Sequence, residues 1–411
     1  MTDPVPRFLA AAATHERCFW LDGGGSREWS GRQSLVGWLD ETDVSLTYSA
    51  ATRQVLRHRS GRSEVVGDDI FAVLDEHLAD EDPAVHWVGY FGYAARADLP
   101  ASVSPAGGMP DAVWMRARHV QLYEHRHEVR SPGLPPPRVL EVPDWYAAEF
   151  AQVQEELLAG NSYEVNLTYR VEVASELAPP TAYLRLRELN PAPYAGYLQH
   201  AVPGHEAWLL SSSPERYAVV DRRRRLQTKP IKGTTPRGAT AEDDERQRVR
   251  LADDPKFRAE NLMIVDLLRN DLAMVCKAGS VTVPELMAVE SYESVHQLVS
   301  TVRGRLRDDV STVGALRSLF PAGSMTGAPK LRTMQIIDAV EATPRGPYAG
   351  AFGWLSGDGR ADLGVVIRSL TTTGDGRWTL GTGGGITVRS DPAEEYAESR
   401  WKADRLLRVF D

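Results

Sequence analysis

The 411-residue sequence contains only two cysteines, Cys18 and Cys276, and they lie far apart in the chain. Two isolated thiols cannot form a disulfide framework or a thiolate metal cage, and this usage is typical of a reducing compartment. No segment approaches the length of a membrane-spanning helix, and residues 1–8 have no apolar signal core. We therefore expect a soluble, cytoplasmic protein with no membrane association.

The chain also lacks an excess of basic residues. It has 47 lysines and arginines against 56 aspartates and glutamates, which gives a formal net charge of −9. Nucleic acids and anionic membrane surfaces both attract basic proteins, so we expect neither as a partner. The most basic run, Arg222–Arg225, fits the solvated tip of a hairpin better than a phosphate site.

Hydrophobic content of 42% and charged content of 25% are ordinary for a globular protein, and this length permits a large core. Helical patterns are expected at 144–158 and 255–268. Most of the predicted strands follow one another as hairpins, so we predict an α+β fold with mainly antiparallel sheets. The proline-rich stretch 131–137 predicts a linker between an N-terminal β-rich region, 1–135, and a second domain, 140–411.

A lysine near the middle of the chain lies in a stretch that cannot be a helix interior. Pro230 and Pro236 flank Lys232, and Gly233 permits a sharp turn. We expect an irregular turn that either carries the amine incidentally or holds it for chemistry. Glu215 lies upstream across a predicted hairpin, where it could act as a general acid beside the amine or form a structural ion pair.

Two predicted helices carry carboxylates in informative places. Glu260 lies on the apolar stripe of helix 255–268, where a carboxylate is costly unless it is paired or binds a metal. Asp391 followed by Pro392 predicts the start of the last helix. Glu395, Glu398 and Lys402 share one face of this helix, either as exposed ion pairs or as ligands for a hard cation and an anion. The sequence has no His/Cys cluster, so Mg²⁺ is the metal expected.

Two glycine-rich runs, 322–330 and 381–386, depart from the nucleotide-binding fingerprints. The first has the wrong spacing between glycine and lysine for a phosphate loop, and the second has Ile386 where a glycine is required. Free backbone N–H groups in either run could bind a carboxylate, but a plain turn is the simpler interpretation of each.

Six motifs occur in the order in which one enzyme family carries them. They are Ser213-Pro-Glu-Arg216, Pro230-Ile-Lys-Gly-Thr234, residues 260–271, Gly327-Ala-Pro-Lys330, Gly383-Gly-Gly-Ile386 and the Glu395/Glu398/Lys402 helix. From about residue 140 to 411 the chain resembles the chorismate-utilising enzymes, which include anthranilate, aminodeoxychorismate, isochorismate and salicylate synthases. The resemblance implies a fold like that of anthranilate synthase component I, with two mainly antiparallel β-sheets packed as a sandwich core and helices on the outside.

Within this family Lys232 resembles the lysine of aminodeoxychorismate synthase component I, where anthranilate synthases carry alanine. The resemblance implies a transaminase-class amination of chorismate to 4-amino-4-deoxychorismate, for 4-aminobenzoate and folate formation. An anthranilate synthase component I or a related aminodeoxyisochorismate synthase is the alternative enzyme. A catalytically inactive, glutaminase-binding scaffold is the non-enzyme alternative. Neither cysteine has the sequence context of a glutaminase nucleophile, so a separate glutamine amidotransferase subunit is expected to supply ammonia.

The resemblance also implies roles for individual residues. Lys232, kept neutral by desolvation, would attack C2 of chorismate. Glu215 would protonate the C4 hydroxyl as it leaves, a role that favours a raised pKa. Mg²⁺ held by Glu260 and Glu398, with Glu395 in the same cluster, would bind the ring carboxylate.

The implied substrate-binding positions are Thr326, Tyr348, Arg368, Gly383, Gly384 and Lys402, with His296 near the ring and Glu164 in the same group. Glu164 stands where isochorismate and salicylate synthases place a water-activating lysine and where some aminodeoxychorismate synthases have glutamine, so water addition is not implied. Phe257 stands one turn before Glu260, where many relatives carry a carboxylate. This departure implies a thinner cluster around the metal.

Overall fold

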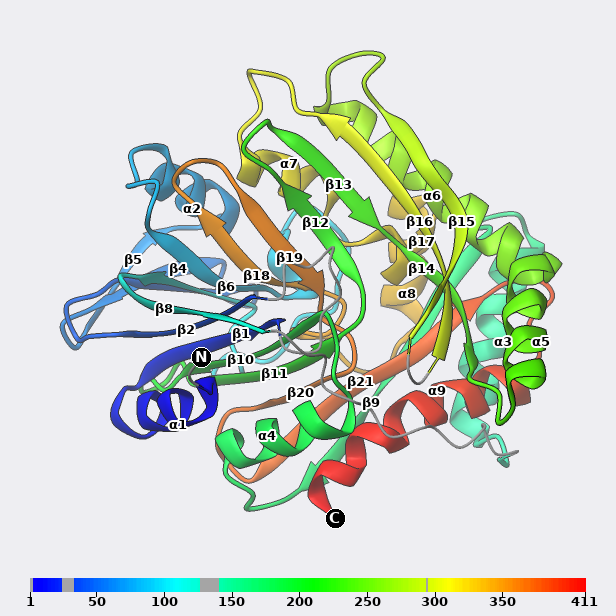
Figure 1. The fold of residues 1–411 in the computed structure, drawn as a ribbon, viewed down its shortest axis with the longest axis horizontal. Helices are drawn as coiled ribbons and strands as arrows, with labels where there is room; N and C mark the ends of the chain where they lie inside the picture. The colour runs from blue at the N-terminus through cyan, green and yellow to red at the C-terminus, as the bar shows by residue number, and fades with distance from the viewer. Residues whose placement is uncertain (1–2, 24–32, 126–139, 293–294) are drawn as a thin grey trace.

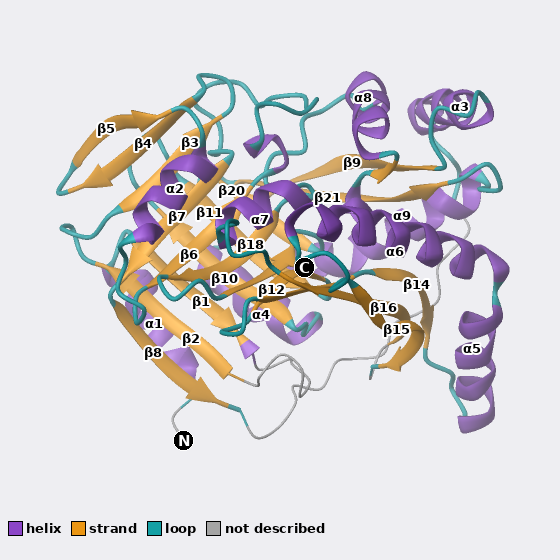
Figure 2. Ribbon diagram, turned by 90° about the horizontal axis from the view of Figure 1, so that it is seen from above, coloured by secondary structure: helices purple, strands orange, loops and turns teal. Residues whose placement is uncertain are grey.

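The computed structural model describes residues 3–23, 33–125, 140–292 and 295–411, whose strands form two large sheets (Figure 1). The strand pairs among these residues are antiparallel. Helices lie on the outside of the sheets (Figure 2). The predicted α+β sandwich is therefore confirmed.

The first sheet has nine described strands. Their order is β17 (Gly327–Ala328), β9 (Glu164–Ala174), β21 (Arg377–Ile386), β20 (Ser369–Thr372), β11 (Ala207–Ser213), β10 (Tyr194–His200), β1 (Arg17–Asp22), β2 (Gln33–Leu39) and β8 (His119–Glu124).

The second sheet has twelve described strands. Their order is β14 (Ile231–Pro236), β16 (Val295–Arg305), β13 (Arg225–Lys229), β12 (Arg216–Val220), β19 (Ala361–Val365), β18 (Ala351–Ser356), β6 (His86–Phe91), β7 (Ala112–Ala117), β3 (Ser45–Ser49), β4 (Gln54–Arg59) and β5 (Arg62–Gly67), with β15 (Thr282–Ser291) also paired to β16.

The space between the sheets is filled by apolar side chains from both. Phe19 and Leu198 come from the first sheet, and Tyr90, Val113 and Phe352 come from the second. Side chains alternate across a strand, so the neighbours of these residues point to the outer faces, where helices cover them. Both faces of each sheet are thus buried over much of their area.

Nine α-helices occur among the described residues. They are α1 (Pro4–Thr14), α2 (Ile70–Ala79), α3 (Asp144–Leu158), α4 (Pro179–Leu189), α5 (Ala241–Asp253), α6 (Pro255–Val275), α7 (Thr312–Leu319), α8 (Lys330–Val340) and α9 (Pro392–Leu407). The helices α1, α4 and α9 cover the outer face of the first sheet, and α2, α6 and α7 cover that of the second. The helices α3 and α8 pack together against β9 (Figure 2). None of the described helices combines the length and apolar character needed to cross a lipid bilayer.

The N-terminal region supplies strands to both sheets, because β1 pairs with β10 and β6 pairs with β18. Strands from both parts of the chain therefore share each core. The proposed division into 1–135 and 140–411 stays a prediction, and its linker at 131–137 lies outside the described residues.

The segment around Lys232 is a strand, not the predicted irregular turn. It forms β14 at the edge of the second sheet, with a register shift between Ile231 and Thr234 in its pairing with β16. Gly233 lies at this bulge with φ +87°, a backbone conformation that favours glycine. Pro230 precedes the strand and Pro236 ends it, positions at which an edge strand tolerates the missing N–H.

The run 381–386 is also a strand rather than the predicted turn, because it pairs along β9 as part of β21. A side chain at Gly381 would place Cβ only 2.2 Å from the ring of Tyr348, so glycine is needed for this close approach. The helix that starts at Pro255 continues seven residues past its predicted end, because Leu272 and Val275 extend its buried stripe.

Candidate active site

A cavity of about 150 Å³ lies beside β14, β21, α6 and α9. It is lined by most of the predicted site residues, namely Glu215, Lys232, Glu260, Tyr348, Arg368, Gly383, Gly384, Glu395, Glu398 and Lys402. These residues come from seven segments of the chain, so the fold gathers in one place positions that are far apart in the sequence.

Glu215 lies in the short connection between β11 and β12, at the wall of this cavity. Ser324 Oγ donates a hydrogen bond of 2.6 Å to Glu215 Oε1. Burial raises the pKa of Glu215 to about 7, against the opposing effects of the Ser324 hydrogen bond and the charge of Lys232. A raised pKa of this kind is what the role of a general acid requires.

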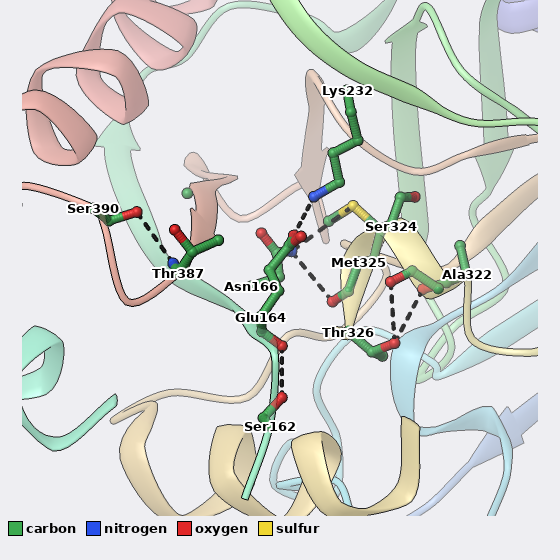
Figure 3. A network of polar contacts seen from close by, with 12 residues as sticks. Ser162, Glu164, Asn166, Lys232, Ala322, Ser324, Met325, Thr326, Thr387 and Ser390 are labelled. Carbon is green, nitrogen blue, oxygen red and sulfur yellow. Dashed lines mark hydrogen bonds and ion pairs between the residues drawn. The ribbon is translucent and has the colours of Figure 1, made fainter. Parts of the chain in front are cut away.

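Lys232 points from β14 towards β9, where its ammonium donates a hydrogen bond to Glu164 Oε1 (Figure 3). Burial lowers the pKa of Lys232, but the negative charges of Glu164 and Glu260 outweigh that effect and raise it above its ordinary value. The ion pair with Glu164 thus favours the ammonium over the neutral amine. The expected neutral amine was wrong, because desolvation was weighed without the buried carboxylate beside it.

Of the three carboxylates predicted to bind a metal, Glu260 has a free ligand atom. Burial raises the pKa of Glu260 to about 7, and Glu260 Oε1 is buried without a hydrogen-bond partner among the described residues. A buried carboxylate oxygen with no partner is costly. Coordination of a cation would satisfy this oxygen, so Glu260 fits the predicted metal.

The last helix begins as predicted, since the Asp391 side chain accepts hydrogen bonds from two backbone N–H groups in its first turn. It positions two carboxylates beside lysines. Glu395 is buried and accepts hydrogen bonds from Lys256 Nζ at 2.8 Å and Ser390 Oγ at 2.7 Å. Glu398 faces the cavity, where 46% of its side chain stays accessible, and pairs with Lys402 Nζ at 2.9 Å.

Two of these acids, Glu395 and Glu398, form ion pairs with lysines. Lys402 holds the pKa of Glu398 below its ordinary value. In the described part of the chain, three metal-ligating groups come within 4.8 Å of one another only at Asp40, Asp43 and His119, far from the cavity in sequence. Glu260, Glu395 and Glu398 do not form such a group, and Glu395 and Glu398 are each paired with a lysine. Two carboxylates together with substrate and water are nevertheless sufficient for Mg²⁺, so the donor set fits the ion.

Arg368 and Tyr348 offer hydrogen-bond donors to the cavity. Arg368 has φ +49°, a strained conformation that is typical of functional sites, and its buried guanidinium lies near the negative charges of Glu398 and Glu215. Burial raises the pKa of Tyr348 to about 12, so its hydroxyl stays neutral and able to donate. Both groups suit the recognition of a carboxylate.

Three predicted site residues do not line the cavity. His296 is buried and bonded to Ser291 Oγ and Asp244 Oδ1, because alternation along β16 turns its neighbour Gln297 to the cavity instead. Its expected place beside the ring is therefore wrong. Thr326 is fully buried behind the wall, where its hydroxyl is directed to backbone carbonyls (Figure 3).

Glu164 is the third, and it lies behind Lys232 rather than at the cavity surface. The side chain is 0% exposed, and its other oxygen, Oε2, has no hydrogen-bond partner in the described residues. A Cβ added at Gly385 would lie 2.2 Å from Glu164 Oε1 and 3.0 Å from Lys232 Nζ. The third glycine of the run 383–385 therefore makes room for this ion pair.

Several lining residues were missed by the sequence analysis. They are Asn166, Lys256, Gln297, Ser324 and Met325. Ser324 lies inside the glycine-rich run 322–330, and Asn166 lies two residues beyond Glu164 on the same face of β9. Strand period and proximity to the motifs could have identified both, whereas Lys256 depends on the packing of α6 beside α9.

Comparisons with known proteins identify the family of the chain. The profile of the chorismate binding enzyme family matches residues 138–408. Aminodeoxychorismate synthase from Streptomyces griseus is 38% identical over 464 aligned residues, which cover 100% of this chain and 63% of that protein. Aminodeoxychorismate synthase component 1 from Escherichia coli (strain K12) is 43% identical over 266 residues, which cover 65% of this chain and 57% of that protein.

The chain thus spans less than two thirds of the length of either relative. Anthranilate synthase component I from Streptococcus pneumoniae TIGR4 shares the fold with a TM-score of 0.75 and 24% identity, covering 92% of each chain. The match of the family profile over most of the chain, together with the cavity it surrounds, shows that the chain belongs to the chorismate binding enzyme family.

Proposed function

We propose that this chain is an aminodeoxychorismate synthase component I, which converts chorismate and ammonia to 4-amino-4-deoxychorismate and water. The observation that carries the proposal is the lysine at the cavity wall, Lys232, with the raised-pKa acid Glu215 lining the same cavity. The names of the relatives from S. griseus and E. coli support the same activity.

Cationic and neutral donors would hold the two carboxylates of chorismate. Arg368 offers a guanidinium that can bind a carboxylate through two parallel hydrogen bonds. Tyr348 adds a neutral hydroxyl, and Lys402 lies beside the cavity with its amine 3.1 Å from the carbonyl of Gly383. Such contacts orient the ring so that C2 faces Lys232 and C4 faces Glu215.

Glu260 and Glu398 would hold Mg²⁺, with Glu395 nearby. When bound, the ion neutralises a substrate carboxylate and fixes the ring. Glu260 would use the buried oxygen that has no other partner in the described chain. Glu398 faces the cavity directly.

The reaction needs a nucleophile and an acid on this chain. The Lys232 amine forms a bond to C2, the two ring double bonds shift towards C4, and the C4–O bond breaks as Glu215 gives its proton to the departing hydroxyl, which leaves as water. Ammonia then adds at C4, the double bonds shift back and the C2–N bond to Lys232 breaks. The Glu215 carboxylate takes a proton from the new C4 ammonium, so the acid is regenerated.

Lys232 also explains why nitrogen would enter at C4 and not at C2. While the lysine is bonded to C2, that carbon is closed to ammonia, and the carbon open to attack is C4. An anthranilate-type enzyme places nitrogen at C2. The shared fold does not separate the two activities, whereas the side chain at position 232 does.

Ammonia would come from a glutamine amidotransferase subunit. The E. coli relative is named component 1, which implies a second component. Both cysteines of this chain are buried, and burial raises the pKa of each thiol, so neither resembles an activated nucleophile for glutamine hydrolysis.

The decisive test is product analysis. We expect the purified chain with chorismate, MgCl2 and ammonium chloride to form 4-amino-4-deoxychorismate without releasing pyruvate, as measured by liquid chromatography and mass spectrometry. Excess EDTA should stop the reaction, and excess MgCl2 should restore it. Anthranilate with stoichiometric pyruvate would contradict the proposal. No turnover with either ammonium or a glutaminase subunit would instead favour a non-catalytic scaffold.

Gly385→Ala should disturb the reaction through the ion pair behind the cavity. The added methyl group cannot coexist with Glu164 Oε1 at 2.2 Å, so the Lys232 amine must move. We expect kcat/KM to fall about 100-fold, because small displacements of a reacting group are costly. Gly108→Ala is the control, since this exposed glycine does not line the cavity and its Cβ would lie 3.3 Å from the carbonyl oxygen of Pro105. Equal activity of the two variants, both folded by thermal denaturation, would contradict the assigned role of the glycine.

A further inference from the structure

The amine of Lys232, the nucleophile of the proposed reaction, forms a buried ion pair with Glu164. An ammonium has no lone pair, so Lys232 must lose a proton before it can attack C2. Water has little access, because the residue is 9% exposed and substrate would cover it further. The side chain to which Lys232 donates its hydrogen bond is Glu164.

Glu164 is placed to receive that proton and is not placed to bind substrate. It is 0% exposed, and it does not line the cavity. Its backbone is fixed in β9, where its carbonyl accepts a hydrogen bond of 2.8 Å from Ser162 Oγ (Figure 3). Gly385 leaves the space that lets the carboxylate reach the amine.

The other carboxylates near Lys232 already have roles in the proposed reaction. The Glu215 carboxylate accepts its hydrogen bond from Ser324, whereas the Lys232 amine donates to Glu164, so Glu164 is the better placed of the two to take the proton of the amine. Glu260 would be occupied by the cation. In a buried pair, moving the proton from ammonium to carboxylate converts two charges into two neutral groups without changing the net charge, so covering of the site by substrate lowers the cost of this transfer.

We propose that Glu164 is the base that activates Lys232. The Lys232 ammonium gives one proton to the Glu164 carboxylate, and the resulting amine uses its lone pair to form the C2–N bond. When ammonia has added at C4 and the C2–N bond breaks, Lys232 leaves as a neutral amine and takes the proton back from Glu164. The cycle therefore consumes no proton at this pair. This role rests on the proposed function and assigns Glu164 to the lysine instead of the substrate.

Glu164→Gln tests the role, because the amide oxygen can still accept a hydrogen bond from Lys232 but cannot take its proton. We expect kcat/KM at pH 7.5 to fall about 100-fold, within the range of a general base. The loss should shrink as hydroxide replaces the base, so the ratio of wild-type to variant kcat/KM should fall about tenfold for each unit of pH above 7. Titration of Glu215 cancels from this ratio, and a merely structural role would leave the ratio independent of pH.

Two further variants complete the design. Glu172→Gln on the same strand makes the same change of charge at an exposed position and should match wild type at every pH. Glu164→Asp keeps a carboxylate one methylene shorter and should retain more activity than Glu164→Gln, although it packs less well.

The adduct on Lys232 separates this proposal from the proposed function. With chorismate and MgCl2 but no ammonium, the wild type should form a covalent adduct on the Lys232 peptide, detected by mass spectrometry after an acid quench. Slow adduct formation by Glu164→Gln, accelerated at high pH, supports the base. If the wild type forms the adduct and Glu164→Gln forms it as fast at every pH, the role of Glu164 is overturned while the function stands. A wild type that forms neither adduct nor aminated product overturns the function itself.

Discussion

Lys232→Ala is expected to lower kcat/KM for 4-amino-4-deoxychorismate formation by on the order of 10⁴-fold, because the variant has no amine to attack C2. The effect should appear in kcat as well as in kcat/KM, since the lost bond forms only during the reaction. Steady-state kinetics with saturating ammonium chloride measures the loss. Mass spectrometry of the quenched enzyme should show no chorismate adduct.

The variant also leaves Glu164 as a buried carboxylate without its cation, so the free energy of unfolding is expected to fall by up to about 3 kcal/mol. The double variant Lys232→Ala/Glu164→Gln removes this unpaired charge and is the appropriate control. It should recover stability in urea denaturation without recovering activity. Unchanged turnover and product in folded Lys232→Ala would show that Lys232 is not the nucleophile.

Local sequence was enough to predict several parts of the site. Asp391 followed by Pro392 predicted the start of α9, and the capping hydrogen bonds confirm it. Glu260 on an apolar stripe predicted a buried carboxylate in need of a partner, and its unpaired oxygen agrees. These features depend on residues within one or two helical turns of each other, so they can be predicted from the local sequence alone.

The strand that carries Lys232 could not be predicted in this way. Prolines and glycines at 230–238 indicate a break in regular structure, but pairing of β14 with β16 joins segments about 65 residues apart in the sequence. The same limit applies to Gly381 and its neighbours, which form a strand because they pair with β9. Nonlocal pairing overrides the turn preference of glycine in both places.

The charge of Lys232 shows a second limit. Its protonation depends on Glu164, which lies 68 residues away in the sequence and approaches from the other sheet. The family resemblance implied a desolvated amine but not the identity of its neighbour. His296 failed for a related reason, because alternation on a strand is predictable but the side that faces the cavity is not.

Glu215→Gln is the second variant with a large expected effect. The amide keeps the shape of the side chain but cannot give a proton to the leaving hydroxyl, so kcat/KM should fall about 10³-fold. Wild-type kcat/KM should decline as pH rises through about 7, because the pKa of Glu215 is raised to about 7 and the acid is present only below it. Glu215→Gln should lose this decline, as measured by pH–rate profiles corrected for enzyme stability.

Ser324→Ala provides the matched control for the origin of that pH dependence. The Ser324 hydroxyl donates to the ionised form of Glu215 and lowers its pKa, so removing it should raise that pKa further. The alkaline decline of kcat/KM should then move to higher pH while activity at pH 6 changes little. A decline that moves to lower pH, or one that persists unchanged in Glu215→Gln, would assign the titration to another group and remove Glu215 as the acid.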